Sequence, residues 1–270
     1  MSQIAIDLAE KERPSLPARL LGHPVGRFAA RLAIVLIIFA LWEYAPLSRP
    51  LRLWVSMPSA IFVQLWQWLA DGTIWIHMGA TLLAMILGYL LGSSTGIGAG
   101  LVLGCLPRTA RVLSPFLVAF YSLPKIALAP LFIIFIGIGI GSKVALVATT
   151  VFFLVFSSTI DGVRDADRDL IRSLTLMGAT PLEIIRKVLI PSALPWIFTG
   201  MRIAVRYAFT NTLLSEMIGS NRGLGFLIES SSGMFDSTGS YAAIFVIIIF
   251  SVTLNELLTW AERKMPGRRA

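Results

Sequence analysis

The amino-acid sequence predicts an all-helical, polytopic membrane protein with six transmembrane helices. The chain has 270 residues, of which 56% are hydrophobic and only 14% are charged, and its mean hydropathy is +0.79. Soluble domains carry about 25% charged residues, so this chain lacks the charge to cover a soluble surface. Its apolar residues also form runs approaching or exceeding the ~20 residues that a helix needs to cross a bilayer. These observations argue against a soluble globular enzyme and against a disordered chain.

Six segments are predicted to cross the membrane. They are residues 32–47, 79–106, 112–142, 144–160, 193–214 and 237–255. The third contains Lys125 and the three prolines 115, 124 and 130, which predict a broken helix. The first and fifth are weaker because they contain charged residues. If the first lies on the membrane surface, five spans remain.

The distribution of Lys and Arg predicts the orientation. With six spans and a cytoplasmic N-terminus, most of the 23 Lys and Arg residues lie on the cytoplasmic side, as the positive-inside rule requires. Orientation therefore accounts for the net charge of +8, and nucleic acid is not an expected partner. The predicted organisation is a cytoplasmic tail over 1–30, a transmembrane domain over 31–262 and a basic cytoplasmic tail over 263–270.

The second predicted span carries a stripe of glycines at a spacing of four residues. The stripe consists of Gly88, Gly92, Gly96, Gly100 and Gly104. On a helix this spacing makes one smooth face that a neighbouring helix can approach closely. The stripe is therefore assigned to helix packing, either within the bundle or at a subunit interface.

The longest hydrophilic insertion between spans, residues 164–191, begins with a predicted short amphipathic helix. Its apolar residues, Leu174 and Met177 among them, recur at helical spacing. Gly178 follows directly and is a typical helix stop. The segment therefore turns sharply at this glycine.

A second short helix is predicted after the turn. Thr180 is the expected N-cap, Pro181 the first helical residue and Glu183 the partner of Thr180 in a capping box. This helix runs to Pro191, where the next membrane helix begins. A simple connection between two spans does not need two short helices with a sharp glycine turn. The segment is thus interpreted as a docking element for a soluble cytoplasmic partner, with a stiff connecting loop as the alternative.

Three basic residues lie inside predicted spans: Lys125, Arg202 and Arg206. Charges in this environment are costly and by default face a cavity, a partner or an aqueous path. Arg202 is close enough to the cytoplasmic surface to reach it by extending its side chain. Lys125 and Arg206 are candidates for lining a path, where they would favour anions.

The segment from Gly178 to Pro191 resembles the "EAA loop" of binding-protein-dependent ABC transporter permeases. In both, a glycine is followed after nine residues by an apolar residue and then by an apolar–proline pair, here Ile190-Pro191. The Glu-Ala-Ala positions of that motif are occupied by Arg172-Ser173-Leu174, so a basic residue replaces the acidic one. Further segments resemble the nitrate/sulfonate/taurine branch of the family. They are Trp42-Glu43, Met57-Pro58-Ser59, 123–132, 135–139, Ser215-Glu216-Met217-Ile218-Gly219 and Gly223-Leu224-Gly225.

The resemblance implies the type I permease fold of ABC importers, with residues 164–191 as the cytoplasmic coupling loop. The residues then expected to couple to the ATPase are Leu174, Met177, Gly178, Ala179, Thr180, Pro181, Leu182, Glu183 and Pro191. The residues assigned to the translocation path are Lys125, Arg206 and Glu216.

The resemblance also implies partners. The chain would be one of two identical copies in the bacterial inner membrane, with both termini cytoplasmic and lipid around it. Two cytoplasmic ATPase subunits would hold ATP and Mg, and an extracytoplasmic binding protein would deliver a small solute. No cofactor or metal is expected in this chain, which would be a non-catalytic subunit. Residues 137–143 lack the Gly-Lys-Ser/Thr order of a phosphate loop, and the two histidines are predicted on opposite membrane sides.

The main alternative is a secondary transporter or channel that works without ATP. Internal repeats are common in secondary transporters. Residues 32–136 and 144–262 share no convincing similarity. A membrane scaffold that transports nothing is a third possibility.

Overall fold

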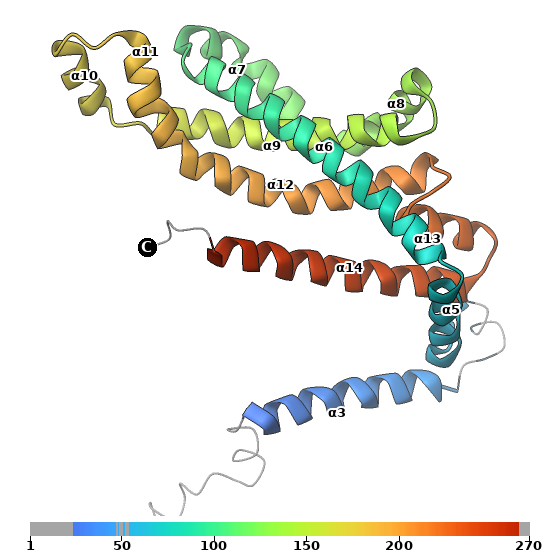
Figure 1. Cartoon of the computed structure of the whole chain (residues 1–270). Helices are drawn as coiled ribbons and strands as arrows, with labels where there is room; N and C mark the ends of the chain where they lie inside the picture. The colour runs from blue at the N-terminus through green and yellow to red at the C-terminus, as the bar shows by residue number, and fades with distance from the viewer. Residues whose placement is uncertain (1–23, 47, 49–50, 52–53, 265–270) are drawn as a thin grey trace, which may run out of the picture. The chain divides into compact units, whose positions relative to one another are not determined.

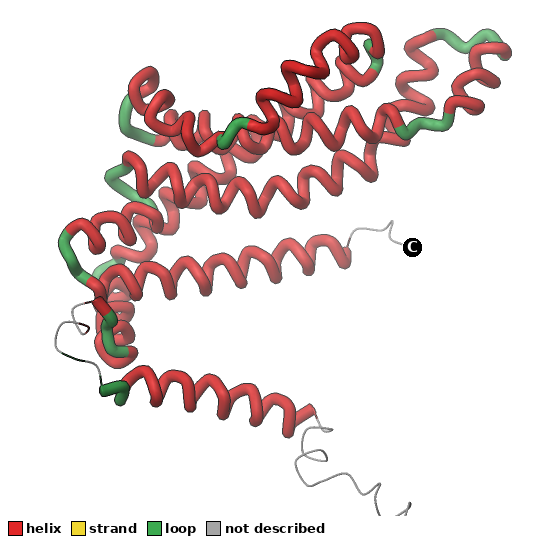
Figure 2. Tube along the Cα trace, turned by 180° about the vertical axis from the view of Figure 1, so that it is seen from behind, coloured by secondary structure: helices red, strands yellow, loops and turns green. Residues whose placement is uncertain are grey.

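The structure, a computed structural model, describes residues 24–46, 48, 51 and 54–264. These residues are predominantly helical and include no β-strand, in agreement with the predicted fold class (Figure 2). The chain forms two compact units, residues 1–63 and residues 64–270. Most of the predicted N-terminal tail, through residue 23, and residues 265–270 of the predicted C-terminal tail lie outside the described part.

The first unit contains helix α3 (Pro24–Glu43) and the start of helix α5 (Pro58–Ala70). The Glu43 carboxylate accepts hydrogen bonds from the Ser59 backbone N–H at 2.9 Å and from the Ser59 hydroxyl at 2.7 Å. The first N–H groups of a helix have no partner within the helix and favour an anion. Glu43 therefore caps α5 and joins two of the segments that carry the family resemblance.

The second unit contains the remaining helices (Figure 1). They are α6 (Thr73–Gly104), α7 (Pro107–Ser122), the 3₁₀ turn η1 (Lys125–Leu128), α8 (Ala129–Ile136), α9 (Ile140–Arg164), α10 (Arg168–Leu176), α11 (Pro181–Ile184), the π-helical turn η2 (Ile185–Leu189), α12 (Ile190–Gly219), α13 (Leu224–Gly233) and α14 (Ser237–Lys264).

Four to five spans are present in the described part of the chain, fewer than the six predicted. Helices long and apolar enough to cross a membrane are α6, α9, the 181–233 helix around α12, and α14. The pair formed by α7 and residues 125–136 adds a fifth if it counts as one span, although it is bent by 84°. Helix α3, the first predicted span, is not among them. The described residues therefore support at most five of the six predicted spans, and the first stays a prediction.

The relative direction of α6 and α9 supports the fifth span. Gly88, midway along α6, faces Val147 in the first half of α9, and Gly104, at the end of α6, faces Val163 near the end of α9. The two helices are therefore parallel. A chain that crosses a membrane twice in the same direction must return in between, and the segment 107–136 is therefore predicted to make this return.

The glycine stripe of α6 packs against α9 of the same chain. The facing side chains are Val147, Val151, Val155, Thr159 and Val163, a row of β-branched residues at the same spacing of four. A Cβ atom added at Gly92 would lie 2.5 Å from the Ala148 carbonyl oxygen, and one added at Gly100 would lie 2.6 Å from the Thr159 Cβ. The absence of side chains thus lets the two backbones approach closely.

The predicted break near Lys125 is present. Helix α7 ends at Ser122, Leu123 is extended with ψ 134°, and the next turn begins at Lys125. Pro124 causes the break because it has no N–H to continue the helix and because it disfavours helical geometry in the residue before it.

Candidate functional site

The segment of residues 164–191, which connects α9 to α12 and for which we keep the name of its predicted role, the coupling loop, is built from locally encoded caps. Helix α10 begins after Asp167, whose side chain accepts hydrogen bonds from the backbone N–H groups of Asp169 at 2.8 Å and Leu170 at 3.2 Å. Such a cap satisfies donors that have no partner within the helix. The loop lies at one end of α9 and α12, far from α8 and α13 (Figure 1).

The turn at Gly178 closes α10 as predicted. The Gly178 N–H donates to the Thr175 carbonyl at 3.0 Å, and the Ala179 N–H donates to the Leu174 carbonyl at 3.0 Å. These two bonds define a Schellman motif, which needs a left-handed residue after the helix. Gly178 has φ +84°, and no atom lies within 4 Å of a Cβ added there. Glycine is therefore favoured at this position by the left-handed backbone conformation and not by a lack of room for a side chain.

The capping box of the second helix is also present. The Glu183 N–H donates to the Thr180 hydroxyl oxygen at 3.4 Å, and the Thr180 N–H donates to the Glu183 carboxylate at 3.0 Å. Lys187 donates to the same carboxylate at 3.0 Å. The Thr180 N–H, and then Lys187, lower the pKa of Glu183 from 4.5 to about 2. Glu183 is therefore ionised at any physiological pH.

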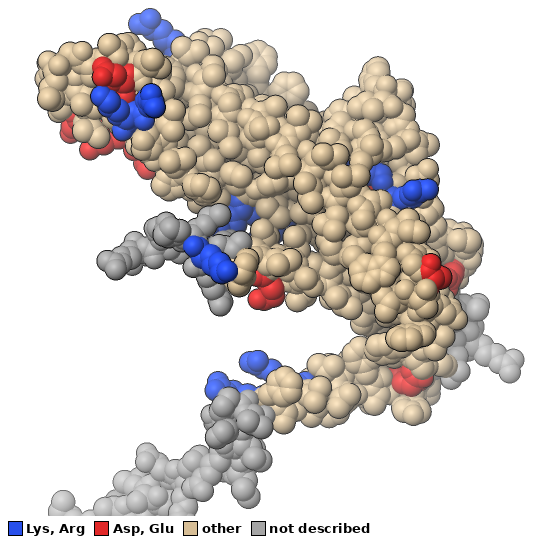
Figure 3. Space-filling view, viewed as in Figure 1, with Lys and Arg blue, Asp and Glu red and all other residues tan. Residues whose placement is uncertain are grey.

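The turn presents an apolar surface to solvent. The exposed fractions are 89% for Leu176, 82% for Met177 and 72% for Leu182. Charged side chains gather around this end of the molecule, whereas the visible surface over the middle of the long helices is almost entirely uncharged (Figure 3). Exposed apolar residues rimmed by charges are typical of a protein interaction site.

The transition from the loop into the membrane helix differs from the prediction. No break occurs at Pro191, because α11 continues through the π-helical turn η2 directly into α12. A proline ring clashes with the carbonyl four residues earlier in a regular helix. The wider π turn, which ends two residues before Pro191, accommodates the ring without ending the helix.

The base of the coupling loop is tightly packed. The Trp196 indole N–H on α12 donates to the Asp165 carboxylate at the end of α9, at 3.2 Å. A Cβ added at Gly162 would lie 2.7 Å from the Cβ of Trp196. Val163, Ala193 and Ile197 form a small buried apolar cluster beside these contacts. The loop is therefore mounted on two helices that are fixed to each other.

The three residues assigned to a translocation path lie in three different places. The Lys125 ammonium donates to the Tyr121 carbonyl and lies 4.8 Å from the Tyr121 ring and 5.6 Å from the Phe153 ring. Arg206 lies at a pocket of about 490 Å³ between α12 and α14, which Asn255 and Glu256 also line. Glu216 is buried inside the bundle. The fold of a single chain does not bring them together.

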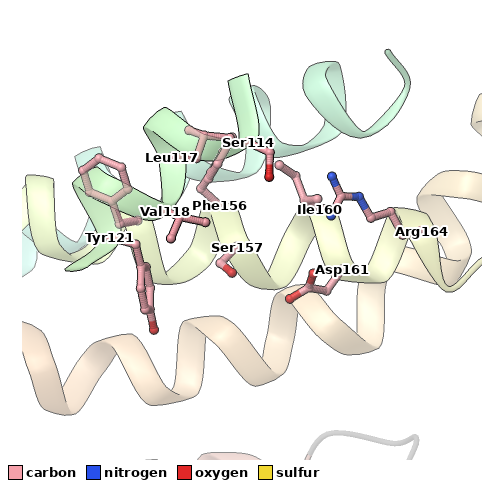
Figure 4. A pocket seen from close by; sticks show the side chains of 10 residues that line it. Ser114, Leu117, Val118, Tyr121, Phe156, Ser157, Ile160, Asp161 and Arg164 are labelled. Carbon is pink, nitrogen blue, oxygen red and sulfur yellow. The ribbon is translucent and has the colours of Figure 1, made fainter. Parts of the chain in front are cut away.

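A second pocket, of about 210 Å³, lies between α7 and α9 (Figure 4). Its lining includes Tyr121 and Phe153, the two rings beside Lys125. The hydroxyl of Ser157 and the charged groups of Asp161 and Arg164 contribute the polar part of the wall on α9. Lys125 thus lies close to two of the aromatic residues that line this partly polar pocket, whose lining extends to the C-terminal end of α9.

Glu216 is the centre of a buried polar cluster at the opposite end of the bundle from the coupling loop. Its carboxylate accepts from the Thr81 hydroxyl at 2.9 Å, from the Gly225 N–H at 3.0 Å and from the Lys143 ammonium at 3.4 Å. Lys143 also donates to the Arg222 carbonyl at 2.7 Å. The exposed fractions are 1% for Glu216 and 5% for Lys143.

Sequence analysis assigned no role to Lys143, which directly precedes the predicted span 144–160. The structure instead places Lys143 in the first turn of α9, paired with Glu216. The available signal was one basic and one acidic residue, each near the same end of two neighbouring spans. Buried charges need such partners.

Comparison with known proteins identifies the family. The family described as "Binding-protein-dependent transport system inner membrane component" matches residues 92–266. The chain is 31% identical over 238 residues to the formylaminopyrimidine transport permease protein ThiX of Halalkalibacterium halodurans, covering 85% of this chain and 94% of that protein. It is 29% identical over 239 residues to the taurine transport system permease protein TauC of Escherichia coli, covering 87% and 86%.

A solved structure shares the fold. An inward-facing form of the MetNI methionine ABC transporter superposes with a TM-score of 0.59 at 22% sequence identity, over 72% of this chain and 93% of that chain. The likeness agrees with the all-helical architecture described above. This chain belongs to the family of binding-protein-dependent transport system inner membrane components, the multi-pass permease subunits of ABC transporters.

Proposed function

We propose that this chain forms the translocation channel of an ATP-driven importer and receives its energy through the coupling loop. The observation that carries the proposal is the apolar turn of Leu176, Met177 and Leu182, exposed between two capped helices. A docking surface needs a backbone that holds its side chains in one arrangement. The Schellman motif and the capping box fix the backbone here.

The proposed assembly contains two copies of this chain, two cytoplasmic ATPase subunits and an extracytoplasmic binding protein. ATP and Mg belong to the ATPase subunits, and this chain is non-catalytic. Family membership supports this composition, because the family name itself refers to a binding protein. In the proposed orientation the coupling loop and both termini are cytoplasmic, as the positive-inside rule favours.

The proposed cargo is a small anionic solute of the nitrate, sulfonate or taurine type. The similarity to TauC supports this class. Lys125 and Arg206, two basic residues within the predicted spans, would attract an anion towards the path. ThiX is named for a formylaminopyrimidine, so uptake of a heterocycle in place of a sulfonate is the outcome that would overturn the proposed cargo.

The test of the coupling proposal is the substitution Gly178→Val. Valine is strained at φ +84°, so the turn must change shape although no neighbouring atom is in the way. The expected result is loss of ATP-driven uptake into vesicles and weaker co-purification of the ATPase. Gly178→Asn is the matched control, because asparagine tolerates the left-handed region. This variant is expected to retain most of the ATP-driven uptake and of the ATPase co-purification.

Normal transport and normal ATPase binding in Gly178→Val would contradict the docking assignment. Uptake by the wild-type chain in vesicles that lack the ATPase would instead favour an ATP-independent transporter, which family membership does not favour.

A further inference from the structure

The buried cluster around Glu216 has no role in the function proposed above. It joins four separate parts of the second unit: Thr81 on α6, Lys143 on α9, Glu216 on α12 and the segment 220–225 that leads into α13. The Leu224 N–H completes it by donating to the Thr81 hydroxyl at 2.9 Å. Because the polar network connects these four parts, a movement of one of them affects the other three.

The cluster and the coupling loop lie at opposite ends of the same two helices. Helix α9 runs from Lys143 to the start of the loop, a distance of roughly 30 Å at 1.5 Å per residue. Helix α12 runs from the end of the loop to Glu216, roughly 40 Å on the same basis. The two helices lie side by side over this length (Figures 1 and 2).

These two helices are fixed to each other at both ends. Near the coupling loop, Trp196 on α12 bonds Asp165 at the end of α9. At the far end, Lys143 pairs with Glu216. Between them, the buried cluster of α9 and α12 is formed by apolar residues, among them Val151, Val155 and Ala208. A displacement of the loop therefore moves α9 and α12 as one body.

The segment 220–225 is pressed onto the Glu216 carboxylate. A Cβ added at Gly223 would lie 2.1 Å from the carboxylate carbon, and one added at Gly225 would lie 2.2 Å from the Leu213 carbonyl oxygen. The Gly223 N–H donates to His77 Nδ1 at 3.0 Å, which ties the segment to α6 as well. When the ends of α6 and α12 move, the segment 220–225 therefore has to move with them.

Partial opening of the cluster is unfavourable. A buried carboxylate or ammonium that loses its partners has no water to replace them, so the network is either kept whole or broken as a unit. Elements joined in this way move together between discrete arrangements.

We propose that Lys143, Glu216 and Thr81 are positioning residues for transport, which transmit the movement of the coupling loop to the segment 220–225 and α13. This inference rests on the proposed ATPase coupling. In that orientation the cluster lies on the extracytoplasmic side, where the binding protein arrives. It thus makes ATPase activity responsive to the loaded binding protein.

The test uses the double substitution Lys143→Met/Glu216→Gln in the complete complex with its ATPase and binding protein. The double variant removes both charges, so no unpaired charge is left buried, and such replacements are often tolerated. The expected result is a complex that assembles and retains basal ATPase activity, while stimulation by loaded binding protein falls about tenfold, a common size for coupling between sites. Stimulation and uptake at wild-type levels would show that the pair only stabilises the fold and would overturn the proposal.

A second comparison covers the case in which the double variant does not assemble. Thr81→Val removes the hydroxyl that bridges Glu216 and Leu224, whereas Thr150→Val removes a buried hydroxyl that bonds only the Leu146 carbonyl of its own helix. Only Thr81→Val is expected to lose stimulation, and equal stimulation in the two variants would overturn the proposal. Failure of the proposed function can be distinguished from failure of this inference by measuring uptake with the wild-type chain alone. Uptake without the ATPase would refute the proposed function itself.

Discussion

At the scale of single residues, Thr180 fixes the start of α11. Its hydroxyl accepts from the Glu183 N–H and its own N–H donates to the Glu183 carboxylate. Thr180→Ala removes the hydroxyl acceptor and should cost about 1 kcal/mol of local stability, which corresponds to roughly fivefold faster hydrogen exchange in residues 181–185. Thr175→Ala is the control, because the Thr175 hydroxyl bonds only the Ile171 carbonyl on its own helix. Equal exchange in both variants would show that the capping box contributes nothing measurable.

The same box predicts a pH dependence. Because the pKa of Glu183 is lowered from 4.5 to about 2, its stabilising contribution is complete above pH 4.5 and is lost as the pH falls towards 2. Titration of the full-length protein with ¹³C-labelled glutamate, followed by NMR, should show one carboxyl that remains ionised near pH 3. Lys187→Met removes a cause of the shift and should raise this pKa towards 4.5. A Glu183 carboxyl that titrates at 4.5 in the wild-type chain would contradict the geometry of the box.

At the scale of elements, the contact between α6 and α9 depends on the glycine stripe. Gly92→Val places a side chain against the backbone of α9, whose Ala148 oxygen lies 2.5 Å from the added Cβ. The helices must separate, and we expect a loss of about 1–3 kcal/mol in the free energy of unfolding, measured by denaturant titration in detergent. Gly98→Val is the matched control on the same helix, because no atom lies within 4 Å of a Cβ added there. A similar loss in both variants would mean that valine in the helix, not the contact with α9, is responsible.

At the scale of the whole molecule, the direction of the helices predicts five crossings in residues 64–270. Because α6 and α9 are parallel, the bent segment 107–136 must cross between them, as a broken span and not as a re-entrant loop. The native Cys105 at the end of α6 and the exposed Ser173 of the coupling loop should then be accessible from one side of the membrane.

Ile138, between α8 and α9, should be accessible from the other side. The measurement is labelling of inverted and right-side-out vesicles with a membrane-impermeant thiol reagent, using Ser173→Cys and Ile138→Cys in a Cys105→Ser background. Labelling of positions 105 and 138 from the same side would show that the segment 107–136 turns back without crossing.

Features that residues close together along the chain encode could be predicted from the sequence alone. The turn at Gly178, the capping box of Thr180 and Glu183, and the break at Pro124 each depend on the conformational limits of residues a few positions apart, which a linear pattern exposes. The apolar excess determined that the chain crosses a membrane, because surface charge of that scarcity is incompatible with water. Six crossings stay a prediction, since length and hydropathy alone do not decide whether an apolar helix such as α3 spans a bilayer.

Contacts between residues far apart along the chain became visible only in the folded structure. Lys143 and Glu216 are 73 positions apart, and Asp165 and Trp196 are 31 positions apart. The partner row of the glycine stripe lies on α9, beyond α7 and α8. Such pairs carry no local signal, because their contact depends on helix direction and rotation, which the packing of the entire bundle sets. A charge that the linear pattern assigns to a loop can therefore be buried against its counterion.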